Sequence, residues 1–154
     1  MRYFYLLIGA IIISSCSQSL GSMPSFGGSQ NLSAHLTGSS PKITKISRIR
    51  PKQYQKIVIS GSGFGTMKPY NGDSGYLQIL DTTGRWSAGY VSATQDDSVW
   101  LDVTSWTDTQ IIIKGFTGAY GQSYWTLKKG DHLTVNVWNA QNHSGPGAIH
   151  TKVR

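Results

Sequence analysis

The stretch Lys56-Ile57-Val58-Ile59-Ser60-Gly61-Ser62-Gly63-Phe64-Gly65 decides the fold. Its first half is rich in β-branched residues, which fit the pleated surface of a sheet, and it predicts a strand over Lys56–Ser60. Its second half sets three glycines around one phenylalanine. This predicts a sharp turn, with positive φ available, and a Phe64 ring that plugs the end of a β core. Neither a Gly-Lys-Ser/Thr sequence nor a helical pattern follows, so the glycines do not form a phosphate-binding loop.

Short segments of the same kind lie on both sides of this stretch, with turn residues between them. Apolar and polar residues alternate most clearly in Leu133–Trp138, and no segment keeps a helical period over three turns. Evenly spaced short strands predict an all-β sandwich or barrel. The predicted strands are Ile43–Ile49, Lys56–Ser60, Tyr76–Leu80, Trp86–Ser92, Val99–Val103, Thr109–Lys114, His132–Trp138 and Ala148–Val153.

Four segments occur in the order of a known family. Pro41–Ser47 reads P-x-I-x-x-I, and Lys56–Gly65 supplies a V-x-I-x-G-x-x-F-G-like strand and turn. Ser105–Ile111 resembles a W-S-D-T-Q-I segment, and Gly130–Val137 resembles a G-x-Y-x-V-x-V strand with His132 at the aromatic position. Together they resemble IPT/TIG domains, and the resemblance implies an immunoglobulin-like β-sandwich over residues 41–154.

The chain departs from the family pattern in two places. Arg48-Ile49-Arg50 precede Pro51, so the first proline-containing turn is displaced. The segment from Tyr70 to Leu101 is longer and richer in aromatic residues than a minimal domain of this type. We expect it to add a hairpin or an extended loop, which leaves the strand pairing there open.

The N-terminus has the pattern of an exported lipoprotein. One arginine and a short apolar run end at Ile13-Ser14-Ser15-Cys16, which contains the only cysteine of the chain. This resembles the lipobox of bacterial lipoproteins, and it implies a signal peptide over residues 1–15 and acylation of Cys16. Ser17, rather than Asp, follows the cysteine, which in enterobacteria-like sorting implies the outer membrane. The alternative is a chance cysteine after an ordinary signal peptide or membrane anchor.

Residues 16–40 connect the predicted anchor to the predicted domain. Ser17 to Ser40 contains no charged residue and no sustained period, and it is rich in serine and glycine. Such composition predicts a flexible tether. The organisation is therefore a signal peptide (1–15), a lipidated cysteine and tether (16–40) and one β domain (41–154).

The sequence offers little support for catalysis or metal binding. The four histidines are scattered, and neither an H-E-x-x-H nor a G-x-S-x-G motif occurs. Loop aspartates suggest calcium, but they lack calcium-loop spacing and are explained equally well as turn residues. We therefore expect no enzyme activity, metal or cofactor. The aspartates considered for calcium are Asp73, Asp81, Asp96 and Asp97, with Asn71 as a further oxygen donor.

Basic residues are concentrated in the first strand and the turn that follows it. No acidic residue lies between Pro41 and Tyr70, and the chain has a net charge of +7. A positive face could bind anionic lipid, lipopolysaccharide or an acidic partner, while export makes nucleic acid an unexpected ligand. The alternative is a charged edge strand that resists aggregation. The candidate binding residues of this basic face are Lys45, Arg48, Arg50 and Lys52.

The second candidate surface is aromatic. The segment from Gly115 to Trp125 combines glycines, hydrogen-bonding side chains and the aromatic residues Tyr120, Tyr124 and Trp125. Exposed aromatic rings stack on sugars or act as anchors in protein interfaces. The alternative is a long hairpin that packs on itself.

These features predict a non-catalytic, lipid-anchored protein of the bacterial cell envelope. Its expected role is protein interaction or assembly, with an envelope protein as partner and the membrane reached through the lipid anchor. The alternative function is binding of a carbohydrate or cell-surface polymer through exposed aromatic residues.

Overall fold

The computed structural model describes residues 40–67, 74–89 and 98–154 of the 154-residue chain. These residues form no helix, and so no helical membrane span, which confirms the all-β prediction. Cys16, the predicted signal peptide and residues 16–39 of the predicted tether lie outside the described residues. The strands are β1 (Lys42–Ile46), β2 (Tyr54–Ser62), β3 (Leu77–Asp81), β4 (Trp86–Gly89), β5 (Val99–Trp106), β6 (Gln110–Gly118), β7 (His132–Val137) and β8 (Gly147–Lys152).

Each predicted strand has a counterpart, although several bounds differ. The first strand was expected to reach Ile49, but β1 ends at Ile46. The ladder is interrupted at Ser47, where the side-chain hydroxyl accepts the Val58 N–H. The Gln55 side chain then accepts from the Arg50 N–H and donates to the carbonyls of Arg50 and Lys52. This network holds the chain in a turn before β2 begins at Tyr54.

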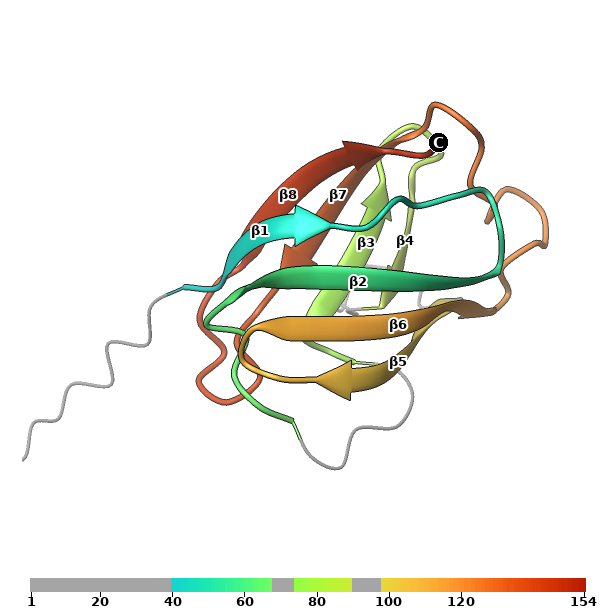
Figure 1. Cartoon of the computed structure of the whole chain (residues 1–154). Coiled ribbons are helices and arrows are strands. Elements are labelled where there is room, and N and C mark those ends of the chain that lie inside the picture. The colour runs from blue at the N-terminus through green and yellow to red at the C-terminus, as the bar shows by residue number, and fades with distance from the viewer. Residues whose placement is uncertain (1–39, 68–73, 90–97) are drawn as a thin grey trace, which may run out of the picture. The chain divides into compact units, whose positions relative to one another are not determined.

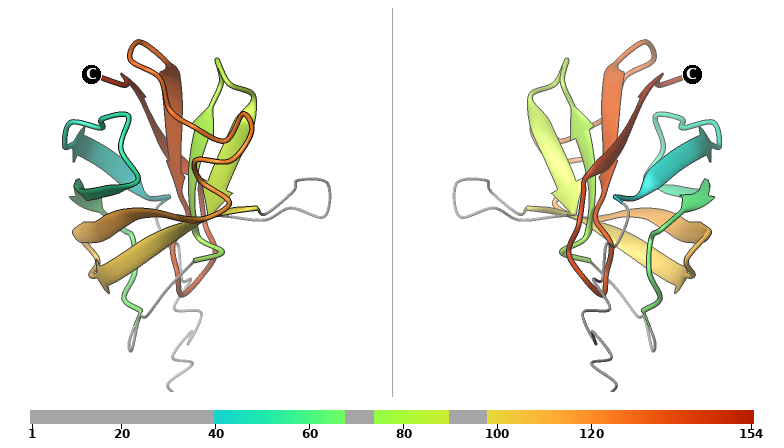
Figure 2. Two further views of the ribbon diagram at one scale, coloured as in Figure 1. Left: turned by 90° about the vertical axis from the view of Figure 1, so that its right-hand side faces the viewer. Right: turned by 90° about the vertical axis from the view of Figure 1, so that its left-hand side faces the viewer.

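All eight strands belong to one mixed sheet of order β1-β2-β6-β5-β4-β3-β7-β8. Neighbours are antiparallel except β4 and β5, which pair in parallel through the single register pair Ala88↔Val99. The sheet folds over at this junction, so that β1, β2, β6 and β5 (the β2 half) lie opposite β4, β3, β7 and β8 (the β7 half) (Figures 1 and 2). The edge strands β1 and β8 approach each other, which nearly closes the sheet.

The core fills the space between the two halves. Inward side chains alternate along the strands, as in β5, where Val99, Leu101 and Val103 are buried. Burial of these apolar side chains is the main source of stability. The fully buried hydrophobic strand residues, 0–1% exposed, are Ile57, Ile59, Leu77, Ile79, Ala88, Val99, Leu101, Val103, Ile111, Ile113, Phe116, Leu133, Val135 and Val137.

The Gly-Phe-Gly turn after β2 closes one end of the core. Phe64 is fully buried, and its carbonyl accepts hydrogen bonds from the indole Nε1 of Trp106 and from the backbone N–H of Ala140, each at 3.0 Å. The Asp108 carboxylate accepts from the N–H groups of Gly63 and Gly65. Both glycines have positive φ, 74° and 72°. Phe64 is thus the predicted plug of the core.

Gly61→Ala tests whether this turn depends on close backbone approach. A Cβ at Gly61 would lie 2.0 Å from the Lys42 carbonyl oxygen and 2.6 Å from the Phe64 ring, so β1 and the plug must both shift. We expect a loss of at least about 2 kcal/mol in the free energy of unfolding, measured by urea denaturation. Gly75→Ala is the matched control, because nothing lies within 4 Å of its Cβ position. Equal losses in the two variants would contradict the close-approach argument.

Candidate functional site

The three aromatic candidates occupy different environments. Tyr124 is 58% exposed, whereas Tyr120 and Trp125 are half-buried against the core. Tyr120 stacks on Phe116 with ring centroids 4.9 Å apart and meets the Trp86 ring edge-on at 6.0 Å. Tyr124 and Trp125 have their centroids 4.9 Å apart at an interplanar angle of 50°. Tyr124 is therefore the exposed ring of the three, and Tyr120 anchors the loop to the core through Phe116 and Trp86.

The loop that carries them, residues 118–128 (the aromatic loop), is held by its own backbone. Gly121 and Trp125 are joined by an N–H···O bond of 2.9 Å, and the Trp125 N–H donates to the Gln122 carbonyl at 3.0 Å. The Leu127 N–H donates to the Tyr120 hydroxyl. The loop thus packs on itself, which is the alternative that the sequence left open. Tyr124 is nevertheless exposed to solvent.

A cavity of about 260 Å³ lies beside Tyr124. Its wall combines an aromatic ring with several hydroxyl groups, one cation and one carboxyl group. Polar groups of this kind orient a ligand in a binding pocket. The β3–β4 turn supplies one side and the aromatic loop the other. The lining residues are Thr83, Gly84, Ser123, Tyr124, Thr126, Lys128 and Asp131.

A pair of buried carboxyl groups, Asp81 and Asp131, lies at the base of this region. Asp81 Oδ1 accepts from the N–H groups of Thr83 and Gly84 at 2.9 and 2.7 Å, and Asp131 Oδ2 accepts from the Lys128 N–H. Burial raises the pKa of Asp81, and the nearby carboxyl group of Asp131 raises it further. The N–H groups of Gly84 and Thr83 oppose this rise, because they stabilise the charged form.

Two buried polar atoms here have no hydrogen-bond partner among the described residues: Asp81 Oδ2 and Trp86 Nε1. Both face Gly84, since a Cβ at that glycine would lie 2.8 Å from each. Asp81 Oδ1, by contrast, accepts two backbone N–H groups. Burial also raises the pKa of Tyr120, and the nearby charges of Asp131 and Asp81 add to the shift.

The basic candidates lie on a different part of the surface. Lys45 is on β1, an edge strand of the sheet, and Arg48, Arg50 and Lys52 are in the β1–β2 connection, all four exposed. They do not converge with the aromatic loop on one cavity. Their position on and beside an edge strand is compatible with both predictions from the sequence. One is a binding face, and the other is a charged edge that prevents pairing with another chain.

Several residues of interest lie outside the two surfaces that the sequence singled out. Tyr54 on β2 and Trp100 on β5 are 74% and 48% exposed on the outer face of the β2 half. Asp81 was interpreted as a turn or calcium residue, and its pairing with Asp131 depends on strand pairing that no local pattern gives. Asp73, Asp96 and Asp97 lie outside the described residues, and the described ones hold no group of three metal-binding side chains.

Comparison of the chain with protein-family models, with curated proteins and with solved structures finds no match. The functional interpretation therefore rests on the residues and geometry of the site.

Asp81→Asn tests the raised pKa of Asp81. Because the folded-state pKa of Asp81 is raised, the folded chain holds a proton that the unfolded chain loses as pH rises. The free energy of unfolding therefore falls as pH rises from the ordinary aspartate pKa through the raised one, and then levels off. An amide keeps the acceptor for Thr83 and Gly84 and supplies a permanent donor toward Asp131. We expect D81N to lose this pH dependence and to exceed the native stability above the raised pKa. Urea unfolding over a pH series measures this, and an unchanged slope would contradict it.

Proposed function

We propose that this chain is a non-catalytic, lipid-anchored binding module of the bacterial cell envelope, placed at the outer membrane through acylated Cys16. The nearly closed eight-stranded sheet and the buried Phe64 and Trp106 support an immunoglobulin-like sandwich of the IPT/TIG type. Its proposed role is to hold an envelope protein partner. The observation that supports this role most directly is the exposed Tyr124 ring on a self-bonded loop.

A rigid loop favours binding, because the ordering cost of the contact residues is largely met before the partner arrives. Tyrosine supplies a large contact area with few rotatable bonds, and tyrosines are enriched among the residues that dominate interface energies. Tyr124 also packs against Trp125, which restricts its rotamers. An exposed tyrosine with these properties suits a protein interface.

Glycan binding is the second candidate, and the cavity beside Tyr124 favours it. Sugars stack on aromatic rings, and their hydroxyl groups both donate and accept hydrogen bonds. The cavity offers Thr83, Ser123 and Thr126 for these bonds, and Asp131 at its base. Its volume of about 260 Å³ suits a single sugar ring better than a peptide.

A hydrolytic role for the carboxyl pair has less support than a structural one. Asp81 is fully buried and accepts two N–H groups of the β3–β4 turn, while Asp131 accepts one N–H group of the turn before β7. Each carboxyl thus has a local capping role that explains it.

Cys16→Ala tests the anchor. Because an acyl chain needs the Cys16 thiol, metabolic labelling with a fatty-acid analogue should tag the native protein and leave C16A untagged. The native chain should also fractionate with membranes and the variant should not. Equal labelling of the two proteins would show that the N-terminal pattern is not a lipobox.

Tyr124→Ala tests the aromatic loop, with Tyr54→Ala as the matched control. Both changes remove an exposed tyrosine ring, so neither should alter the melting temperature strongly, but only Tyr124 belongs to the proposed site. We expect Y124A to weaken partner binding by about 2 kcal/mol or more and Y54A to leave it unchanged. Crosslinking in intact envelopes identifies a protein partner, and a glycan array scores sugar binding.

The pattern of results separates the candidates. Loss of a crosslinked partner in Y124A supports the protein interface, and loss of an array signal supports the glycan site. Binding that fails in Y54A and survives in Y124A would move the site to the outer face of the β2 half.

A further inference from the structure

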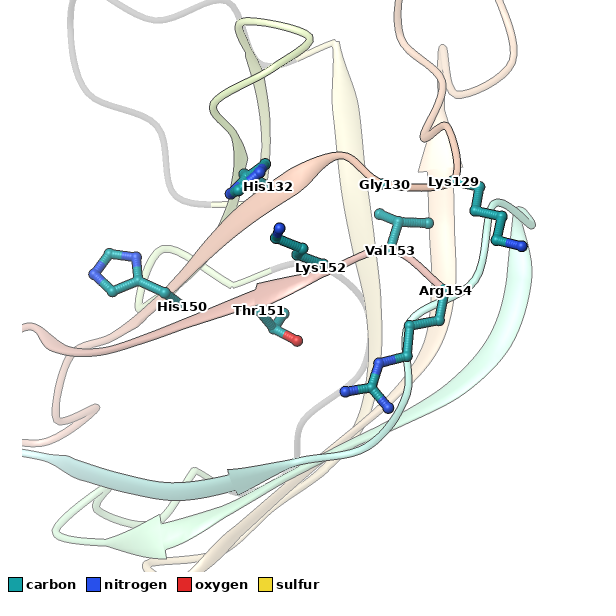
Figure 3. A pocket seen from close by; sticks show the side chains of 8 residues that line it. All are labelled: Lys129, Gly130, His132, His150, Thr151, Lys152, Val153 and Arg154. Atoms are coloured by element: carbon teal, nitrogen blue, oxygen red, sulfur yellow. The ribbon is translucent and has the colours of Figure 1, made fainter.

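A second, larger cavity of about 700 Å³ lies at the end of the β7–β8 pair (Figure 3). It is formed by the turn before β7, by β8 and by the residues that follow it. His132 and Lys152 are register partners across β7 and β8, so their side chains project from the same face of the sheet. The lining residues are Lys129, Gly130, His132, His150, Thr151, Lys152, Val153 and Arg154.

The charged side chains that line this basic cavity have one sign. Lys129, Lys152 and Arg154 are exposed, two histidines lie beside them, and none of the eight lining residues is acidic. The nearest acid in the sequence, Asp131, is buried and directed to the Lys128 N–H and to Asp81. Asp131 is thus engaged inside the protein, away from these cations.

Backbone hydrogen bonds hold the two segments that carry these cations. The Gly130 N–H donates to the Val153 carbonyl, and the Val153 N–H donates to the Asp131 carbonyl, both at 2.9 Å. The Arg154 N–H donates to the Ile49 carbonyl, also at 2.9 Å. The backbone around the cavity is therefore ordered, and the like charges along it attract an anion from solution.

We propose that the basic cavity binds the phosphate groups of an anionic envelope glycan. Lysine and arginine are the residues that bind phosphate, lysine as a compact charge and arginine through its planar fork of N–H donors. The volume admits a phosphate together with the sugar units next to it. The Ile49 contact extends the positive surface, because Arg48 and Arg50 flank that residue and are exposed.

A glycan fits this surface better than a bilayer does. The described large apolar side chains that are strongly exposed are Tyr54, Trp100 and Tyr124, and none of them lines the cavity. A membrane surface would be met by apolar side chains that insert between lipids. Across the turn from Lys128 to His132, the cavity beside Tyr124 offers hydroxyl groups instead. The choice of an envelope glycan as ligand rests on the proposed envelope location, whereas the basic cavity itself does not depend on what Tyr124 binds.

The test uses the detergent-solubilised full chain and two matched double variants. Lys152→Gln with Arg154→Gln removes two charges from the cavity, and Lys56→Gln with Lys114→Gln removes two exposed charges from the β2 half. The probes are a phosphorylated mannan, the same mannan after removal of its phosphate, and phosphatidylcholine vesicles with and without phosphatidylglycerol. Binding is measured at low and at physiological salt.

We expect the native chain to bind phosphorylated mannan, to bind it less at higher salt, and to ignore the dephosphorylated mannan. The cavity variant should bind roughly tenfold more weakly or worse, and the β2-half variant should bind like the native chain. Equal losses in both variants would overturn the site, since net charge alone would then explain binding. Absence of mannan binding would overturn it as well. So would a preference for phosphatidylglycerol that only the cavity variant loses, because the occupant would then be a bilayer.

Discussion

The carbonyl oxygen of Phe64 is the point on which the rest of the fold depends. It accepts the Trp106 indole N–H and the Ala140 backbone N–H, and so joins the ends of β2 and β5 to the loop after β7. These donors come from opposite halves of a sheet whose halves, among the described residues, share one register pair, between β4 and β5. A buried carbonyl left unpaired is costly, so each donor must keep its place. The positive φ angles of Gly63 and Gly65 make the geometry accessible.

Much of this architecture could be predicted from the sequence because it is local. Period-two alternation marks the strands, and the Gly-Phe-Gly turn identifies Phe64 as a plug without reference to distant residues. The register could not be predicted, because it depends on which strands meet. The parallel contact of β4 with β5 and the approach of β1 to β8 leave no pattern in either strand. The end of β1 was also misjudged, since the Ser47 hydroxyl accepts the Val58 N–H and interrupts the ladder.

Less of the candidate sites than of the fold could be predicted from the sequence. The sequence indicated the aromatic segment but did not show which of its rings are exposed. Tyr120 and Tyr124 have similar sequence surroundings, and only the packing of Tyr120 on Phe116 distinguishes their burial. The Asp81–Asp131 pair could not be predicted from the sequence, since each residue on its own has the pattern of a turn residue. The basic cavity was missed for a different reason. Basic residues are dense in the sequence around Arg48, and this density is what predicted a binding face there. The basic cavity instead combines Lys129, from the turn before β7, with Lys152 and Arg154.

Asp131 links the two cavities through its opposite ends. Its side chain turns inward to the Lys128 N–H and to Asp81, and its carbonyl oxygen turns to the Val153 N–H at the basic cavity. Burial of this carboxyl removes the acid that would otherwise sit among Lys129, His132 and their neighbours. The raised pKa of Asp81 reflects the closeness of the two groups, because burial and the Asp131 carboxyl both disfavour its charged form. The positive charge on one side of the turn is thus left uncompensated because the carboxyl nearest to it in the sequence is directed to the other side.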